Sequence, residues 1–138
     1  MRSTIKYLLD TSALYPLVLK VREKLLFYTE LFAILDLTIY EIGNVVWREY
    51  RKGRITDPVS VSRMFEVVVG SIEKLSINEE VCRVQEIAIE NNLTFYDAAY
   101  IYVTRKNKLK LVTEDKVLLN LPESIDLNNL LKELDLLN

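Results

Sequence analysis

Short apolar runs alternate along the chain with longer segments in which apolar residues recur every three or four positions. The runs are typical of buried strands, and the longer segments are typical of amphipathic helices. We expect strands at residues 7–9, 74–77 and 109–113, with an edge strand at 124–127. We expect helices at residues 13–20, 23–35, 39–52, 58–69, 79–91, 96–107 and 129–136. This alternation predicts an α/β domain with a small parallel sheet.

Three helix boundaries carry local signals. Thr38 is followed three residues later by Glu41, which is the pattern of a capping box, so a helix is expected to begin directly after Thr38. Gly53 is suited to end that helix. Asp57 followed by Pro58 places a capping residue before a proline in the first helical position.

The composition excludes several classes of catalytic site. The chain has no histidine and one cysteine, which excludes Ser-His-Asp and Cys-His catalysis as well as histidine- or thiolate-ligated zinc. Its three glycines lie far apart, so no glycine-rich phosphate loop is present. Carboxylates, hydroxyls, lysine and arginine remain. A metal held by such groups would be a hard ion, Mg²⁺ or Mn²⁺.

Charge and hydropathy bear on partners and location. The net charge of −2 means that contact with nucleic acid would depend on local basic clusters. The N-terminus has no unbroken apolar segment of signal-peptide length, and the most apolar region, residues 25–39, contains Glu30 and Asp36 and is too short to span a bilayer. We therefore expect one cytoplasmic domain, residues 1–138, with no membrane segment and no internal disulfide.

Four acidic residues stand where a parallel sheet would bring them together. Asp10 ends the first strand, Asp115 follows the strand at 109–113, and Glu41 and Asp97 lie near helix N-termini. Each has a simpler explanation, because acids cap helices and favour their first turns. In a parallel sheet, however, strand ends and the following helix N-termini share one edge, where ligands bind. Carboxylates gathered there repel one another and favour a divalent cation, which suits phosphodiester cleavage.

Four segments carry the patterns Asp-x-Ser, Glu-x-x-Asn, Tyr-Asp-Ala-x-Tyr and Thr-x-Asp, in that order. They are residues 8–14, 40–46, 94–100 and 111–115. Together they resemble the conserved segments of PIN-domain nucleases, and most of all the VapC-type toxins of prokaryotic toxin–antitoxin pairs. The resemblance covers nearly the whole chain. It implies a PIN-like three-layer α/β/α fold with a small central parallel sheet, and a homodimer.

The same resemblance implies an activity and a site. The chain would be an Mg²⁺- or Mn²⁺-dependent endoribonuclease that hydrolyses RNA with metal-activated water and is held inactive by a cognate antitoxin protein. The resemblance makes four acids both catalytic and metal-binding, namely Asp10, Glu41, Asp97 and Asp115. It also makes Ser12 and Thr113 polar helpers near the metal.

Arg48 and Asn44 are further candidates because they share a helix face with Glu41. On that face Asn44 is predicted to hold Glu41, and Arg48 to contact an RNA phosphate. The alternative for Arg48 is a solvated position near the helix C-terminus, where basic residues are favoured. Tyr100 could stack on an RNA base, but it is not assigned to the site.

Two other functions remain open. One is an RNA-processing PIN nuclease that has no antitoxin, and the other is a catalytically inactive PIN-like binding module. A phosphatase of the haloacid dehalogenase type also begins with a strand that ends in Asp. It is disfavoured because Ser12 stands where that family has its second Asp.

Overall fold

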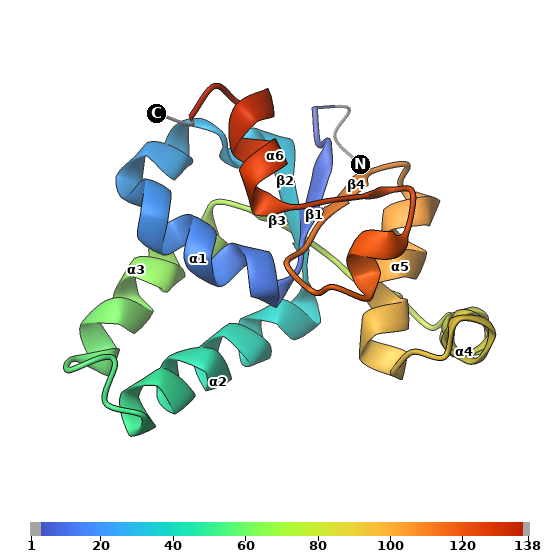
Figure 1. Cartoon of the computed structure of the whole chain (residues 1–138), viewed down its shortest axis with the longest axis horizontal. Coiled ribbons are helices and arrows are strands. Elements are labelled where there is room, and N and C mark those ends of the chain that lie inside the picture. The colour runs from blue at the N-terminus through green and yellow to red at the C-terminus, as the bar shows by residue number, and fades with distance from the viewer. Residues whose placement is uncertain (1–3, 137–138) are drawn as a thin grey trace.

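A five-stranded parallel sheet forms the centre of the molecule, with strand order β3-β2-β1-β4-β5 (Figure 1). The computed structural model describes residues 4–136. The strands are β1 (Tyr7–Leu9), β2 (Phe32–Leu35), β3 (Glu73–Leu75), β4 (Lys110–Val112) and β5 (Ser124–Ile125). The α-helices are α1 (Thr11–Val21), α2 (Asp36–Arg51), α3 (Pro58–Gly70), α4 (Val81–Asn91), α5 (Phe95–Lys106) and α6 (Leu127–Glu133). Short 3-10 helices span Arg22–Phe27, Thr29–Leu31 and Leu118–Asn120.

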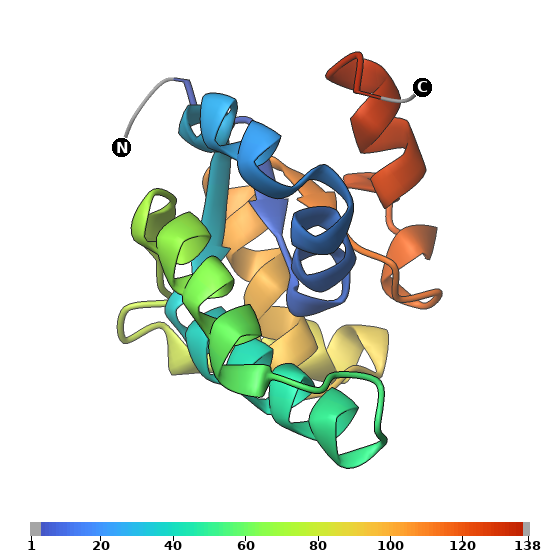
Figure 2. The same ribbon diagram turned by 90° about the vertical axis from the view of Figure 1, so that its left-hand side faces the viewer.

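Helices cover both faces of the sheet, so the molecule has three layers. Successive strand residues point to opposite faces. Leu9 and Ile34 therefore pack with α1, α2, α3 and α6, while Leu8 and Ala33 pack with α4 and α5. In Figure 1 α1 and α3 lie to the left of the strands and α4 and α5 to the right, and Figure 2 views the α1 and α3 side. This confirms the predicted α/β/α fold with a small parallel sheet.

The prediction of one helix over residues 23–35 was wrong. This stretch contains two 3-10 helices followed by β2. All four residues of β2 are buried, because the strand lies between β1 and β3 and is covered on both faces. A strand buried on both faces shows no alternation of polar and apolar residues, and its apolar run then looks like part of a helix.

The start of α2 also differs from the prediction. The helix begins at Asp36, directly after β2, rather than after Thr38, so the predicted capping box at Thr38 is absent. Thr38 is instead the third residue of the helix and is fully buried. Its hydroxyl is hydrogen-bonded to Tyr100 rather than to the helix backbone. The predicted start at Asp57 is confirmed, because its side chain caps α3 by accepting from the amide of Ser60.

The first helix follows β1 with a single residue between them. Asp10 caps it by accepting from the amide of Ala13, so Thr11 and Ser12 are free to point their hydroxyls elsewhere. The amide of Asp10 donates to the carbonyl of Val112 in β4, which sets the ends of the two strands side by side. No helix in residues 4–136 has both the length and the apolar character that crossing a bilayer requires.

Candidate active site

Asp10 is held at the end of β1 by hydrogen bonds to both of its carboxylate oxygens. Oδ1 accepts from Oγ of Ser12 at 2.6 Å and from the amide of Ala13 at 3.0 Å. Oδ2 accepts from Oγ1 of Thr113, at the end of the neighbouring strand, at 2.5 Å. The side chain is only 5% exposed. Ser12 and Thr113, predicted as polar helpers, are therefore the side chains that fix this acid.

Backbone amides fix those two hydroxyls in turn. The amide of Glu114 donates to Oγ of Ser12 at 2.9 Å, and the amide of Asp115 donates to Oγ1 of Thr113 at 3.0 Å. Each hydroxyl thus accepts from a backbone amide and donates its own proton to Asp10. The loop after β4 thus orients the carboxylate that ends β1.

The pKa of Asp10 is raised from 3.8 to about 6, chiefly because burial disfavours the charged carboxylate. The hydrogen bonds from Ser12, Thr113 and Ala13 act in the opposite direction and lower it. The negative charge of Asp97 raises it further. A cation placed beside Asp10 would relieve both the burial cost and the repulsion.

Glu41 is held from two other helices. Its Oε1 accepts from Oγ1 of Thr11 and from the hydroxyl of Tyr100, each at 2.7 Å. The Tyr100 hydroxyl also lies 2.5 Å from Oγ1 of Thr38. Tyr100 is buried, which leaves its ring unable to stack on a base as considered above. The hydrogen bonds that hold Glu41 thus come from Thr11 and Tyr100 rather than from Asn44.

Asp97 and Asp115 complete the set of predicted acids. Asp97 lies in the first turn of α5, and its pKa is raised by burial and then by the charges of Asp115 and Glu41. Oδ1 of Asp115 accepts from the amides of Val117 and Leu118, so this exposed acid also shapes the turn after β4. The four acids therefore belong to one electrostatic neighbourhood, with Asp97 at its centre.

Nothing in residues 4–136 neutralises this neighbourhood. The ion pairs that the structure describes join other acids, namely Glu49, Glu86, Glu123 and Glu133. In the same part of the chain, no three acidic or cysteine side chains are grouped so that they could enclose one metal ion by themselves. The arrangement is a set of carboxylates at one edge of the sheet that no described ion pair neutralises.

A depression of about 360 Å³ lies beside Glu41, between the start of α1 and the middle of α2. Its lining consists of Thr11, Ser12, Tyr15, Pro16, Glu41, Asn44, Val45 and Arg48. We call it the α1–α2 pocket. It places the two remaining predicted residues, Asn44 and Arg48, in the same pocket as Glu41, while Asp10, Asp97 and Asp115 do not line it. Arg51, on the same helix, instead lies over the ring of Trp47.

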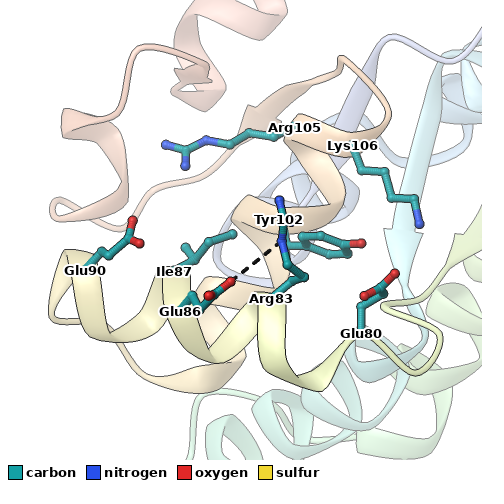
Figure 3. Close-up of a pocket in the computed structure, with 8 residues that line it drawn as sticks. All are labelled: Glu80, Arg83, Glu86, Ile87, Glu90, Tyr102, Arg105 and Lys106. Carbon is teal, nitrogen blue, oxygen red and sulfur yellow. Dashed lines mark ion pairs between the residues drawn. The ribbon is translucent and has the colours of Figure 1, made fainter.

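A larger depression, of about 680 Å³, lies elsewhere, between α4 and α5 (Figure 3). Its charged residues are of both signs, and Arg83 and Glu86 pair within it at 3.8 Å. The side chain of Lys106 lies over the ring of Tyr102. None of the four predicted acids lines this depression, so its size does not make it the reactive centre.

Sequence reasoning did not assign Thr11, Thr38 or Tyr100 to the site. A signal for Tyr100 was present, because it stands three residues after Asp97 and therefore shares its helix face. Thr38 was interpreted as a cap, which concealed its inward direction.

Comparison with known proteins identifies the family. No protein-family model matches the chain. The curated protein Exonuclease VapC9 of Pyrobaculum aerophilum is 42% identical over 131 residues, which make up 94% of this chain and 96% of that protein. The chain belongs to the VapC family of PIN-domain nucleases. Ribonuclease VapC3 of the same organism is 30% identical over 87 residues, covering 61% of this chain and 66% of that protein.

Three solved structures resemble this chain in fold. The crystal structure of PAE2754 from Pyrobaculum aerophilum has a TM-score of 0.86 at 42% identity and covers 95% of this chain and 97% of that one. A toxin–antitoxin complex from Klebsiella pneumoniae shares the fold with a TM-score of 0.61 at 18% identity, covering 87% of this chain and 96% of that one. DNA-bound VapBC from Salmonella typhimurium shares it with a TM-score of 0.65 at 16% identity, covering 89% of this chain and 98% of that one. The identity with VapC9 confirms the predicted family and its nuclease class, and the solved structures confirm the fold.

Proposed function

We propose that this VapC chain is a divalent-metal-dependent ribonuclease and the toxin of a VapBC-type pair. The observation that carries the proposal is the group of four acids at one sheet edge, without an ion-pair partner in residues 4–136. Mutual repulsion of this kind destabilises a fold unless a ligand relieves it. The names of the two VapC relatives, an exonuclease and a ribonuclease, support nucleic acid as the substrate.

The residues fit a hard divalent ion. All of their donor atoms are oxygens, which Mg²⁺ and Mn²⁺ prefer. Mg²⁺ usually binds one or two carboxylates directly and keeps several waters, so a closed set of three ligands is not required. Asp10, Glu41, Asp97 and Asp115 would hold the ion. When bound, the ion lowers the pKa of water to generate a nucleophile and offsets charge on the phosphate.

Asp10 and Glu41 are already held in position to bind a metal ion. Ser12 and Thr113 hold the two oxygens of Asp10, but Oδ2 accepts only one hydrogen bond from the described residues and retains acceptor capacity. Thr11 and Tyr100 both donate to Oε1 of Glu41, while Oε2 has no hydrogen-bond partner in residues 4–136. Each acid thus offers one oxygen to a ligand from a fixed position.

The α1–α2 pocket is suited to the RNA strand next to the scissile phosphate. It joins Glu41 and Ser12 at one side to Asn44 and Arg48 at the other. Arg48 is exposed and forms no ion pair with the described residues. Its guanidinium is suited to a phosphate, and the amide of Asn44 to a sugar or base edge.

Exposed apolar residues support a protein partner, which we propose to be the cognate antitoxin. Ile39, Trp47 and Tyr50 are exposed on α2, and Val67 is exposed on α3. An apolar depression of about 150 Å³ lies between these helices. The homodimer is likewise proposed, and light scattering of the purified protein at several concentrations tests it.

An RNA cleavage assay with Mg²⁺, Mn²⁺ and EDTA tests the activity. We expect cleavage with either metal, none with EDTA, and none by Asp10→Asn with metal. Asp57→Asn is a matched control, because Asp57 also caps a helix but lies outside the acid group. Cleavage of a circular RNA would establish the endonucleolytic mode, since circular RNA offers no end to an exonuclease. A folded wild-type protein that cleaves no RNA with either metal would favour the inactive binding module.

A further inference from the structure

The hydroxyl of Tyr100 occupies a buried position among three elements. Its ring belongs to α5 and is 3% exposed. The hydroxyl lies 2.7 Å from Oε1 of Glu41, 2.5 Å from Oγ1 of Thr38 and 3.3 Å from Oγ1 of Thr11. Phenylalanine would fill the same volume in an apolar core without any polar group to satisfy. Packing of the ring therefore does not account for the hydroxyl.

The direction of each proton follows from the acceptors. Glu41 is a carboxylate and can only accept, so Thr11 and Tyr100 each give their single proton to its Oε1. The oxygen of Tyr100 must then accept from Thr38, whose hydroxyl has no other partner in residues 4–136. The result is a directed chain from Thr38 through Tyr100 to Glu41.

We infer that Tyr100 is a positioning residue for Glu41, and that Thr38 sets the direction of the Tyr100 hydroxyl. The inference rests on the proposed function, because it assigns Glu41 to the metal. With both donors on Oε1, the carboxylate is held in one orientation and Oε2 remains for the ligand. Partners of this kind, which orient a metal ligand without touching the metal, commonly change metal affinity 10- to 100-fold when removed.

Tyr7 provides a matched control for removal of a hydroxyl. It is also buried, and its hydroxyl also donates to a carboxylate, Oε1 of Glu133, at 2.6 Å. Glu133 belongs to α6 and pairs with Lys110, outside the acid group. Tyr7→Phe and Tyr100→Phe thus make the same chemical change in two places, of which only one concerns Glu41.

The experiment measures Mn²⁺ binding by calorimetry in the absence of RNA, together with thermal melting in EDTA. We expect Tyr100→Phe to bind Mn²⁺ about 10-fold more weakly than wild type, and Tyr7→Phe to bind it like wild type. If Tyr100→Phe melts at a lower temperature yet binds Mn²⁺ like wild type, the tyrosine is structural and the inference is overturned. If wild type binds no Mn²⁺, the proposed function fails first, and the inference fails with it.

Thr38→Val tests the second half of the chain and serves if Tyr100→Phe does not fold. It should weaken Mn²⁺ binding by a smaller factor than Tyr100→Phe, since the tyrosine can still reach Glu41. Because Thr38 acts through Tyr100, the double variant should bind Mn²⁺ no more weakly than Tyr100→Phe alone. The directed chain would be overturned if the losses of Mn²⁺ affinity in the two single variants multiplied in the double variant. It would also be overturned if Thr38→Val bound Mn²⁺ with wild-type affinity.

Discussion

Oγ1 of Thr113 donates to Oδ2 of Asp10 at 2.5 Å, across the ends of the adjacent parallel strands β4 and β1. With the bond from Ser12 to Oδ1, it holds both oxygens of a buried carboxylate. A ligand that is already held in place loses little conformational freedom when it binds. The pairing of β1 with β4 therefore orients the Asp10 carboxylate, because it brings Thr113 beside it.

Removing that bond should weaken the site more than the fold. Thr113→Val preserves the shape of the side chain but leaves Oδ2 of Asp10 without its donor and the amide of Asp115 without its acceptor. We expect metal-dependent RNA cleavage at limiting Mn²⁺ to fall about 10- to 100-fold. Thr113→Ser preserves the hydroxyl and should retain most of the activity. Equal losses in both variants, measured as rates against Mn²⁺ concentration, would mean that the Thr113 methyl group matters instead.

The raised pKa of Asp10 predicts how the metal-free protein responds to pH. Its pKa is about 6 when folded and 3.8 ordinarily, so between these values the native state binds more protons than the unfolded state. The contribution of Asp10 to stability is therefore greatest at low pH, declines as pH rises through this window, and is constant above it. The shift corresponds to about 3 kcal/mol at most.

The measurement is urea unfolding in EDTA at several pH values from 4 to 7, for wild type and Asp10→Asn. The difference isolates Asp10 from the other carboxylates, such as Glu133, whose pKa is lowered by its bonds to Tyr7 and Lys110. We expect the variant to gain stability relative to wild type as pH rises. A constant difference between the two proteins would contradict the raised pKa.

Asp97 should be a source of strain in the metal-free protein. Its pKa is raised by burial and by the charges of Asp115 and Glu41, so its ionised form is disfavoured in the fold. Asp97→Asn should therefore melt higher than wild type in EDTA. Wild type should gain more from Mg²⁺ or Mn²⁺, about 2.7 kcal/mol at a hundred times the dissociation constant. If metal leaves the melting temperature of wild type unchanged and Asp97→Asn melts lower than wild type, then Asp97 is a structural residue.

The α/β class with a parallel sheet, and the edge at which the acids gather, were predicted because both follow from patterns along the chain, while the three-layer arrangement came from the family resemblance. Asp10 was placed correctly, since a short apolar run that stops at an acid marks a strand end. Residues 23–35 could not be assigned from their periodicity. Whether such an apolar run becomes a helix or a strand depends on which neighbours cover it, and β2 is covered on both faces by segments far away in sequence.

The hydrogen bonds that orient the acids were beyond sequence reasoning for a similar reason. Tyr100 and Glu41 meet only because α5 and α2 begin at the same edge of the sheet. The direction of the Thr38 hydroxyl depended on whether α2 starts at residue 36 or 39, and helix boundaries are often misplaced by two or more residues. Residue types thus indicated the acids, and the resemblance named Ser12 and Thr113, while the partners of Glu41 required the fold.

Arg48 should contribute one phosphate contact to RNA binding, because it lines the α1–α2 pocket beside Glu41. We expect Arg48→Ala, made in an Asp10→Asn background that does not cleave, to bind single-stranded RNA more weakly. The slope of log affinity against log salt should fall by about 0.7, the value for one phosphate on a single strand. Arg51→Ala is the matched control, since Arg51 is near the end of the same helix but lies over Trp47 outside the pocket. Equal slope changes in the two variants would mean that α2 acts through its general positive charge, and that the pocket does not direct the RNA.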